Sequence, residues 1–210
     1  MNYLKGRESL YYDHNSPSEK KYRNIYSAVL VIALVILIIF FLNLTVFSRI
    51  IVDGNSMQYT LQDGDVLYVN ELNKTPKHED IVIIKNVIGK DSWIIKRVIG
   101  LEGDIIEFEN GKVYRTEPNK ERKELSNYEH KTTTSSITRY EIKKGQIFYM
   151  GDNREPGGSL DSRILGPCTY DNIVGVVPEW SVWVKGINKS FYNNITVPLQ
   201  KFMVMIGFAR

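Results

Sequence analysis

The chain has 210 residues, of which 43% are hydrophobic and 24% are charged, a balance typical of a folded globular protein. Its net charge is only +3, and no run of Lys and Arg is interleaved with aromatic residues, so we expect no nucleic-acid partner. The single cysteine, Cys168, excludes an internal disulfide and is expected to be a small buried thiol. None of the three histidines has a Cys or acidic partner at a recognisable motif spacing, so we expect neither a metal nor a cofactor.

An uninterrupted apolar run, Ala28–Phe47, follows a long polar N-terminal stretch. The run carries no charge, and as a helix it would span ~30 Å, the thickness of the hydrocarbon core of a bilayer. A core helix need not be apolar all round, and a cleaved secretory signal would have a shorter apolar region followed by small residues. We therefore predict an uncleaved transmembrane helix over residues 28–47.

The charges that flank this run predict its orientation. Five cations precede the run and only Arg49 follows it closely; the five are Lys5, Arg7, Lys20, Lys21 and Arg23. By the positive-inside rule, residues 1–27 form a cytoplasmic tail and residues 48–210 lie outside the cell. The first 24 residues are polar, so we expect that part of the tail to be mobile.

Beyond Ile50 the pattern changes to short apolar runs that are separated by turn residues. These runs are rich in β-branched and aromatic residues, which favours strands. Asn110-Gly111 between two of them indicates a type I′ hairpin. The runs do not alternate with helices, so we predict a mainly β fold, with one N-terminal transmembrane helix followed by an antiparallel β domain. The predicted strands are 65–69, 80–84, 93–99, 104–108, 112–114, 146–150, 173–177 and 181–184.

Two segments do not fit this strand pattern. Residues 115–141 are charged, polar and poor in aliphatic side chains, so we expect a solvated excursion or a small cap. Residues 196–208 are apolar but interrupted by Gln200 and Lys201, and they are too few to span a bilayer. They form either a core element or an interfacial helix.

Ser56 and Lys96 are the candidate chemical groups. Ser56 lies in turn-rich sequence just beyond the apolar run, where a serine is most often a capping or surface residue. Lys96 lies in the middle of the predicted strand 93–99, and if its amine points inward, desolvation lowers its pKa. A neutral amine can then take the proton of a serine hydroxyl. Lysine is the expected base because the three histidines lie in the tail or in polar loop sequence. They are His14, His78 and His130.

A third segment, Gly151–Arg163, is dense in turn formers and small polar residues. It is either a long hairpin loop or a wall of an active site. In a wall, Asp161 and Arg163 could pair, and the hydroxyl of Ser159 could orient the lysine amine.

Together these segments resemble the signature boxes of bacterial type I signal peptidases. The resemblance covers most of residues 50–185 in the order of the family. The matching residues are Ser56-Met57-x-x-Thr60-Leu61, Gly64-Asp65, Lys96-Arg97-Val98-Ile99-Gly100 followed by Gly103-Asp104, Gly151-Asp152-Asn153-Arg154, and Ser159-x-Asp161-Ser162-Arg163.

This resemblance implies a membrane-bound serine endopeptidase with a mostly antiparallel β catalytic domain on the outer face of the bacterial plasma membrane. Ser56 would be the nucleophile, its N–H would contribute to the oxyanion hole, and Lys96 would be the general base. Ser159 would bind the amine, Asp161 and Arg163 would form a structural ion pair, and Gly151 would belong to the same supporting box. The partners would be membrane lipid, exported preproteins cut after a small-x-small sequence, and in some settings the secretion translocon.

Three positions depart from the family pattern. Tyr59 stands where the family usually has proline, Glu155–Gly158 form a longer spacer than usual, and Gly54 has no side chain to donate to an oxyanion. These departures leave open a specialised, pilus-associated member. They also leave open a catalytically silent assembly or chaperone factor for surface proteins such as pilins. A cytosolic Ser–Lys autoprotease of the repressor type is disfavoured by the apolar run and by the lack of a helix-turn-helix pattern.

Overall fold

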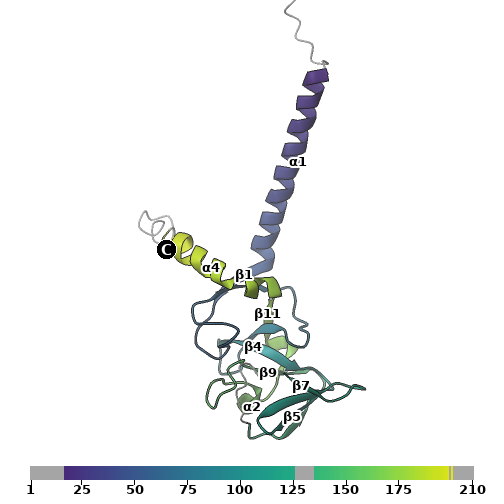
Figure 1. Ribbon diagram of the computed structural model, residues 1–210, viewed down its shortest axis with the longest axis vertical. Coiled ribbons are helices and arrows are strands. Elements are labelled where there is room, and N and C mark those ends of the chain that lie inside the picture. The colour runs from purple at the N-terminus through teal and green to yellow at the C-terminus, as the bar shows by residue number, and fades with distance from the viewer. Residues whose placement is uncertain (1–16, 126–134, 199, 201–210) are drawn as a thin grey trace, which may run out of the picture. The chain divides into compact units, whose positions relative to one another are not determined.

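The computed structural model describes residues 17–125, 135–198 and 200, and its chain forms two compact units, Met1–Thr45 and Val46–Arg210 (Figure 1). The elements are α1 (Pro17–Val46), β1 (Phe47–Ile51), β2 (Val66–Asn70), β3 (Ile81–Lys85), β4 (Trp93–Gly100), β5 (Ile105–Glu109), β6 (Lys112–Thr116), β7 (Lys123–Leu125), β8 (Arg139–Glu141), β9 (Gln146–Met150), α2 (Ser162–Leu165), β10 (Cys168–Thr169), η3 (Tyr170–Asn172), β11 (Ile173–Val177), α3 (Glu179–Trp183), α4 (Lys185–Phe191) and η4 (Tyr192–Thr196).

The first unit is the long helix α1. A 20-residue window, Lys20–Ile39, is long and apolar enough to cross a bilayer, with a mean hydropathy of 2.2. The helix is longer than predicted: residues 17–27 of the predicted cytoplasmic tail are helical, including residues 17–24, for which the sequence predicts mobility. Proline is favoured at the start of a helix, and a nucleated helix extends at little cost through good helix formers such as Glu, Lys and Arg. The predicted disorder of residues 1–16 and most of the predicted element 196–208 lie outside the described residues.

The second unit contains two antiparallel sheets, as predicted. Seven strands form the larger sheet in the order β1-β2-β11-β3-β4-β9-β10, with β1 and β10 at its edges. Seven of the eight predicted strands are present within one or two residues at each end. The sequence prediction missed β1, whose residue Phe47 had been assigned to the membrane helix. Because β1 is apolar and directly follows α1, its composition alone does not separate it from the span.

The smaller sheet has four strands in the order β7-β6-β5-β8. Asn110 and Gly111 both have positive φ, 51° and 76°, as a type I′ turn requires, and they connect Glu109 to its partner Lys112. The segment 115–141 is therefore not wholly a solvated excursion. Its first two residues complete β6, and β7 and β8 pair with the sheet on either side, while residues 126–134 lie outside the described residues.

The predicted strand 181–184 is wrong, because this segment is the helix α3. Its buried face holds Ser181, whose Oγ accepts a hydrogen bond from the N–H of Tyr68 on β2 at 2.7 Å. Trp180 packs edge-on against Phe47 at 5.6 Å between ring centroids and lies beside the ring of Tyr68. A four-residue run of alternating residues does not separate a strand from a short helix, so tertiary contacts determine the outcome here.

Three buried clusters hold this unit together. The first lies under β1 and the turn that follows it, and contains Met57 and Leu61. The second lies between β3, β4, β9 and β11, and it includes Cys168, which is a buried free thiol as predicted. The third joins the smaller sheet to β4 and β9. The central strand β4 contributes to all three clusters and β9 contributes to the second and third, so both provide a base for the residues at their ends.

We expect Ser181→Ala to lower the free energy of unfolding by about 1 kcal/mol, because the half-buried N–H of Tyr68 loses its acceptor. Urea unfolding of the full chain in detergent, followed by tryptophan fluorescence, measures the change. Ser190→Ala on the exposed side of α4 is the control and should stay within about 0.5 kcal/mol of wild type. Equal stability of Ser181→Ala and wild type would show that this contact does not hold α3 on the sheet.

Candidate active site

The turn that follows β1 presents Ser56. Met57 is buried in the first core cluster, and its carbonyl accepts hydrogen bonds from the N–H groups of Thr60 and Leu61 at 3.1 and 2.8 Å. Ser56 itself is half-buried. Tyr59 has a φ of 84°, which proline cannot adopt, so the departure from the family pattern at this position reflects a differently built turn.

Lys96 comes from the central strand β4. Residues 93–97 of β4 pair with β3, but pairing with β9 begins only at Arg97. The strand edge at 93–96 is therefore unpaired on one side, next to the turn that carries Ser56. The following residues of β4 are all buried, and Lys96 is itself only 3% exposed.

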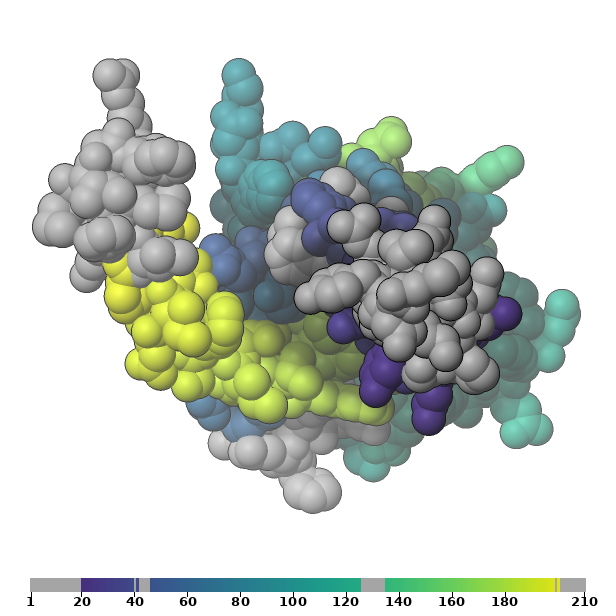
Figure 2. All heavy atoms as spheres, turned by 90° about the horizontal axis from the view of Figure 1, so that it is seen from above, coloured from purple at the N-terminus to yellow at the C-terminus, as the bar shows by residue number. Residues whose placement is uncertain are grey.

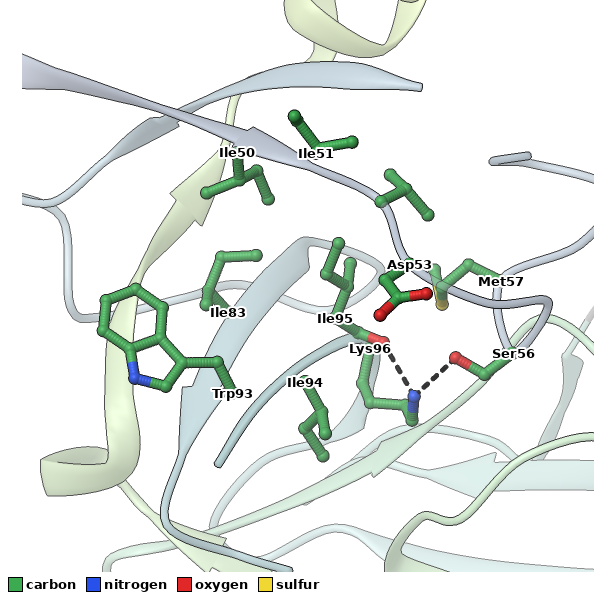
Figure 3. A pocket seen from close by; sticks show the side chains of 11 residues that line it. Ile50, Ile51, Asp53, Ser56, Met57, Ile83, Trp93, Ile94, Ile95 and Lys96 are labelled. Carbon is green, nitrogen blue, oxygen red and sulfur yellow. Dashed lines mark hydrogen bonds between the residues drawn. The ribbon is translucent and has the colours of Figure 1, made fainter. Parts of the chain in front are cut away.

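The two side chains meet (Figure 3). Lys96 Nζ lies 2.7 Å from Ser56 Oγ and also donates to the carbonyl oxygen of Ile95 at 2.9 Å. Burial removes water from the amine and lowers its pKa to about 8, although the carboxylates of Asp161 and Asp152 act in the opposite direction. With this pKa about one amine in ten is neutral at pH 7, and a neutral amine can accept the serine proton.

The segment after β9 packs directly against the turn that carries Ser56. The N–H of Asn153 donates to the carbonyl of Ser56 at 3.0 Å. Gly151 lies where these segments approach most closely, since a Cβ at that position would lie 2.3 Å from both Ser56 O and Ser159 Oγ. Any larger residue at 151 would push the two serines apart, so Gly151 is required by space.

Asp161 and Arg163 form a buried, bidentate ion pair with both contacts at 2.8 Å. Asp161 also caps α2 and accepts the N–H of Gly151 at 3.0 Å. Burial alone would raise the pKa of Asp161, but the Arg163 guanidinium and the other donors outweigh it and hold this pKa below its usual range. The carboxylate therefore stays ionised and fixes the wall of the site.

Ser159 is buried in this wall but is not hydrogen-bonded to Lys96. Its hydroxyl lies near enough to the Asp161 carboxylate to help lower the pKa of that group, without forming a well-directed hydrogen bond. The structure thus brings Ser56 and Lys96 into contact and places Gly151, Ser159 and Asp161 beside them.

Sequence reasoning missed a second buried ion pair beneath the site. Arg97, next to Lys96, makes a bidentate contact with Asp152 at 2.8 and 2.7 Å, and it also reaches Thr60 Oγ1 at 3.3 Å and the carbonyl of Glu79 at 2.7 Å. This pair joins β4, the turn that carries Ser56 and the segment after β9. One indication of this pair is present in the sequence: Arg97 in the segment Lys96–Gly100 and Asp152 in the segment Gly151–Arg154 carry opposite charges.

A further missed residue is Lys185 at the start of α4. Its amine donates to the carbonyl of Thr60 and lies 3.7 Å from the carboxylate of Asp65. Asp65 is buried and also accepts the N–H of Gln62. The C-terminal helices are thus tied to the turn that carries Ser56, which no local sequence pattern indicates.

A groove of about 330 Å³ opens beside Ser56 and Lys96. Its walls are mostly aliphatic and come from β1, from the residues after it and from the unpaired edge of β4 (Figure 3). The lining residues are Ile50, Ile51, Val52, Asp53, Ser56, Met57, Ile83, Trp93, Ile94, Ile95 and Lys96. The groove can hold an extended, largely apolar peptide with a carbonyl next to Ser56.

Two departures from the family pattern contact each other. The hydroxyl of Tyr59, where the family has proline, lies 3.5 Å from Glu155 Oε1 in the longer spacer. The turn that carries Ser56 and the loop before Ser159 therefore contact each other at these two positions. In the described part of the chain, no group of three or more His, Cys, Asp or Glu residues could hold a metal ion.

Comparison with known proteins identifies relatives. The family model "Signal peptidase, peptidase S26" matches residues 25–183. Signal peptidase I P of Bacillus subtilis subsp. natto is 34% identical over 75% of this chain and 89% of that protein. Signal peptidase I V of Bacillus subtilis is 38% identical over 61% of this chain and 82% of that protein.

A crystal structure of a signal peptidase I from Enterococcus faecalis is similar to 50% of this chain and 97% of that chain, with 23% identity and a TM-score of 0.40. Signal peptidase IB of Staphylococcus aureus is 30% identical over 71% of this chain and 85% of that protein. The matched span and these relatives show that the chain belongs to the S26 family and is a type I signal peptidase, a serine peptidase that cleaves signal peptides from exported preproteins.

Proposed function

We propose that this enzyme cleaves its preproteins with Ser56 as nucleophile and Lys96 as general base. The observation that carries the proposal is the 2.7 Å contact between Lys96 Nζ and Ser56 Oγ, made by an amine that is almost completely buried. His78, the one histidine among the described residues, is hydrogen-bonded to Asp104 at 2.6 Å and makes no hydrogen bond to Ser56. The amine is therefore the base within reach of the hydroxyl.

The reaction proceeds through an acyl-enzyme. Neutral Lys96 takes the proton of the Ser56 hydroxyl while the oxygen attacks the scissile carbonyl and forms a tetrahedral intermediate. The resulting ammonium gives this proton to the leaving amine of the mature protein, and the ester with Ser56 remains. Lys96 then takes a proton from the water that attacks the ester, and it returns this proton to Ser56 Oγ as the signal peptide leaves.

The backbone N–H of Ser56 is the proposed oxyanion donor. Among the described residues this N–H makes no hydrogen bond within the chain, so it is available to the developing negative charge. Gly54 contributes no side chain, and its own N–H is held by Asp63 Oδ1 at 2.9 Å. A donor of this kind stabilises the transition state by about 3 kcal/mol.

The supporting box positions these groups. We assign the buried hydroxyl of Ser159 as a further hydrogen-bonding partner of the lysine amine during the reaction, because it lies in the wall beside the dyad without a well-directed partner of its own. The Asp161–Arg163 pair holds that wall, and Gly151 lets it approach Ser56.

The substrate binds as an extended strand in the apolar groove. The edge of β4 at 93–96 has free backbone groups that can pair with a peptide, as in other cases of strand addition. The floor next to Ser56 is formed by the buried side chains of Val52 and Met57 together with Ile95. A close apolar floor suits the small residues of a small-x-small sequence.

The apolar part of α1 serves as the membrane anchor. Its Lys20–Ile39 window is long enough to span a bilayer, and cations are enriched on its N-terminal side. We therefore place the N-terminus in the cytoplasm of a bacterial cell and the unit that starts at Val46 outside. Sharing one bilayer with a preprotein raises the effective concentration of the cleavage site near Ser56.

The geometry of the site does not support the alternative that this protein is a catalytically silent assembly or chaperone factor. A protein that only binds pilins or other surface proteins has no need of a desolvated lysine in contact with a serine, since burial of that amine costs stability. The departures at Tyr59 and Glu155 alter the rim of the site but leave the two side chains in contact.

Ser56→Ala and Lys96→Met should each reduce cleavage of a preprotein with Ala-x-Ala before the cut by at least about 10³-fold, because one removes the nucleophile and the other removes the base. The measurement is single-turnover cleavage by the purified full chain in detergent. Lys96→Arg is the matched control for charge, and it should be equally inactive because a guanidinium stays protonated. Full cleavage by Ser56→Ala would exclude this mechanism.

The rate should rise with pH. Lys96 works only when neutral, and with a pKa of about 8 the neutral fraction grows about tenfold from pH 7 to pH 9. We therefore expect kcat/KM to increase by roughly that factor and to level off above pH 9. A profile that is flat from pH 6 to pH 9, measured with a substrate that does not titrate in this range, would contradict the role of the lysine.

A further inference from the structure

The groove beside Ser56 and Lys96 has one acidic side chain among the described residues that line it, that of Asp53. The other lining residues are uncharged except for Lys96, and most of them are aliphatic. In the proposed mechanism Lys96 is neutral when it accepts the serine proton, so the carboxylate of Asp53 is then the remaining charge of the lining. The active form of the groove is therefore apolar, with a negative charge at one place.

The chain holds Asp53 at the rim of this groove. The preceding residue, Val52, is buried, its N–H donates to the carbonyl of Asp65 at 2.9 Å, and its own carbonyl accepts the N–H of Gly64 at 2.9 Å. Asp53 itself is exposed, and its side chain points from the end of β1 into the groove, on the side of Lys96 (Figure 3). In Figure 2 part of the blue chain near β1 lies at the surface beside the yellow C-terminal helices. The carboxylate is thus fixed in place and open to solvent.

The carboxylate of Asp53 differs from the other acidic groups around the site, because in the described part of the chain it has neither a hydrogen bond nor an ion pair. Asp152 and Asp161 form buried ion pairs with arginine, and Asp63 and Asp65 each accept a backbone N–H at 2.9 Å. Those four carboxylates support the fold. A carboxylate that faces a substrate groove without a structural contact of this kind is suited to bind a charge on the substrate.

The geometry of an extended peptide determines which residue of the substrate meets Asp53. Successive residues of a strand lie ~3.3 Å apart and point to opposite faces. In the proposed complex the two small residues of the small-x-small sequence face the floor, next to Met57 and Ile95. The side chain between them then points away from the floor, toward the exposed mouth of the groove, where Asp53 lies. This middle residue is also close to the bond that Ser56 attacks, and Asp53 comes shortly before Ser56 in the chain.

We propose that Asp53 is a specificity-determining residue of this peptidase, whose carboxylate binds a cationic side chain, Lys or Arg, at the middle position of the small-x-small sequence. The inference rests on the proposed dyad and groove and deepens them. A glutamate or aspartate at this position of the preprotein is disfavoured, because two like charges then meet at the mouth of the groove. The pair between Asp53 and the substrate is partly exposed, so each change of one charge unit should alter kcat/KM about threefold.

The test compares three preproteins that differ only at the middle position, with Arg, Gln or Glu between two alanines. Cleavage by the purified full chain in detergent is measured at pH 9, where most Lys96 amines are neutral while arginine and glutamate remain charged. We expect kcat/KM for the Arg substrate to be about tenfold higher than kcat/KM for the Glu substrate, with the Gln substrate in between. A wild-type ratio within about twofold of one would overturn the proposal.

Variants at position 53 identify the source of the preference. Asp53→Asn should bring the ratio of Arg to Glu cleavage close to one, and Asp53→Arg should reverse it. Asp91→Asn is the matched control, because Asp91 is also exposed but does not line the groove, and it should keep the wild-type ratio. The ratio compares substrates of one enzyme, so a loss of folded protein does not change it. An unchanged ratio in Asp53→Asn would contradict the proposal, and this variant decides even where Asp53→Arg fails to fold.

Salt and the separate kinetic constants distinguish binding from a structural role. The preference should lie in KM rather than in kcat, because the two charges attract each other equally in the ground state and the transition state. It should also shrink at least about twofold between 50 and 500 mM NaCl. A side chain that only supports the rim would instead change the rates of all three substrates by one factor at every salt concentration. Undiminished cleavage by Ser56→Ala would overturn the proposed dyad, whereas equal rates on the three substrates with an active wild type overturn this inference alone.

Discussion

The amine of Lys96 is kept out of water and in contact with the hydroxyl of Ser56, and the rest of the site is arranged around this contact. A lysine whose pKa falls from 10.5 to about 8 on folding costs about 3 kcal/mol of stability at neutral pH. This cost is fully present below pH 8 and disappears above pH 10.5, because the unfolded chain binds the additional proton between these values. Under the proposed mechanism, the surrounding structure therefore compensates for a destabilising group whose neutral form accepts the serine proton.

Buried ion pairs on both sides of the lysine provide rigidity without giving the amine a direct acidic partner. Asp152 is paired with Arg97, and Asp161 is paired with Arg163, so each carboxylate is neutralised by its own guanidinium. The two carboxylates still act on Lys96 at a distance and raise its pKa, but less than burial lowers it. An unpaired carboxylate at either position would favour the ammonium and oppose the role as a base that we propose for Lys96. The ion pairs thus hold three chain segments together and leave the lysine able to lose its proton.

Much of this arrangement could be predicted from sequence, and the omissions have physical reasons. The strands and the Asn110-Gly111 turn have strong local patterns, and the order of the boxes indicated Ser56 and Lys96. The segment 181–184 was assigned to a strand because its helical state depends on a hydrogen bond between Ser181 and Tyr68, which are far apart in the chain. The contact of Lys185 with the nucleophile turn is equally non-local. Ser159 was expected to bind the lysine amine, and the substrate-free structure has no such hydrogen bond.

The proposed dyad depends on whether the Lys96 amine can lose its proton, and a direct measurement of the pKa of this amine tests it best. In the full chain with ¹⁵N-labelled lysine side chains, the Lys96 signal is assigned by its loss in Lys96→Arg and is followed by NMR from pH 6 to pH 11. We expect Lys96 to titrate near pH 8, well below the other lysines, because its amine is buried. Titration of Lys96 together with the remaining lysines above pH 10 would contradict it.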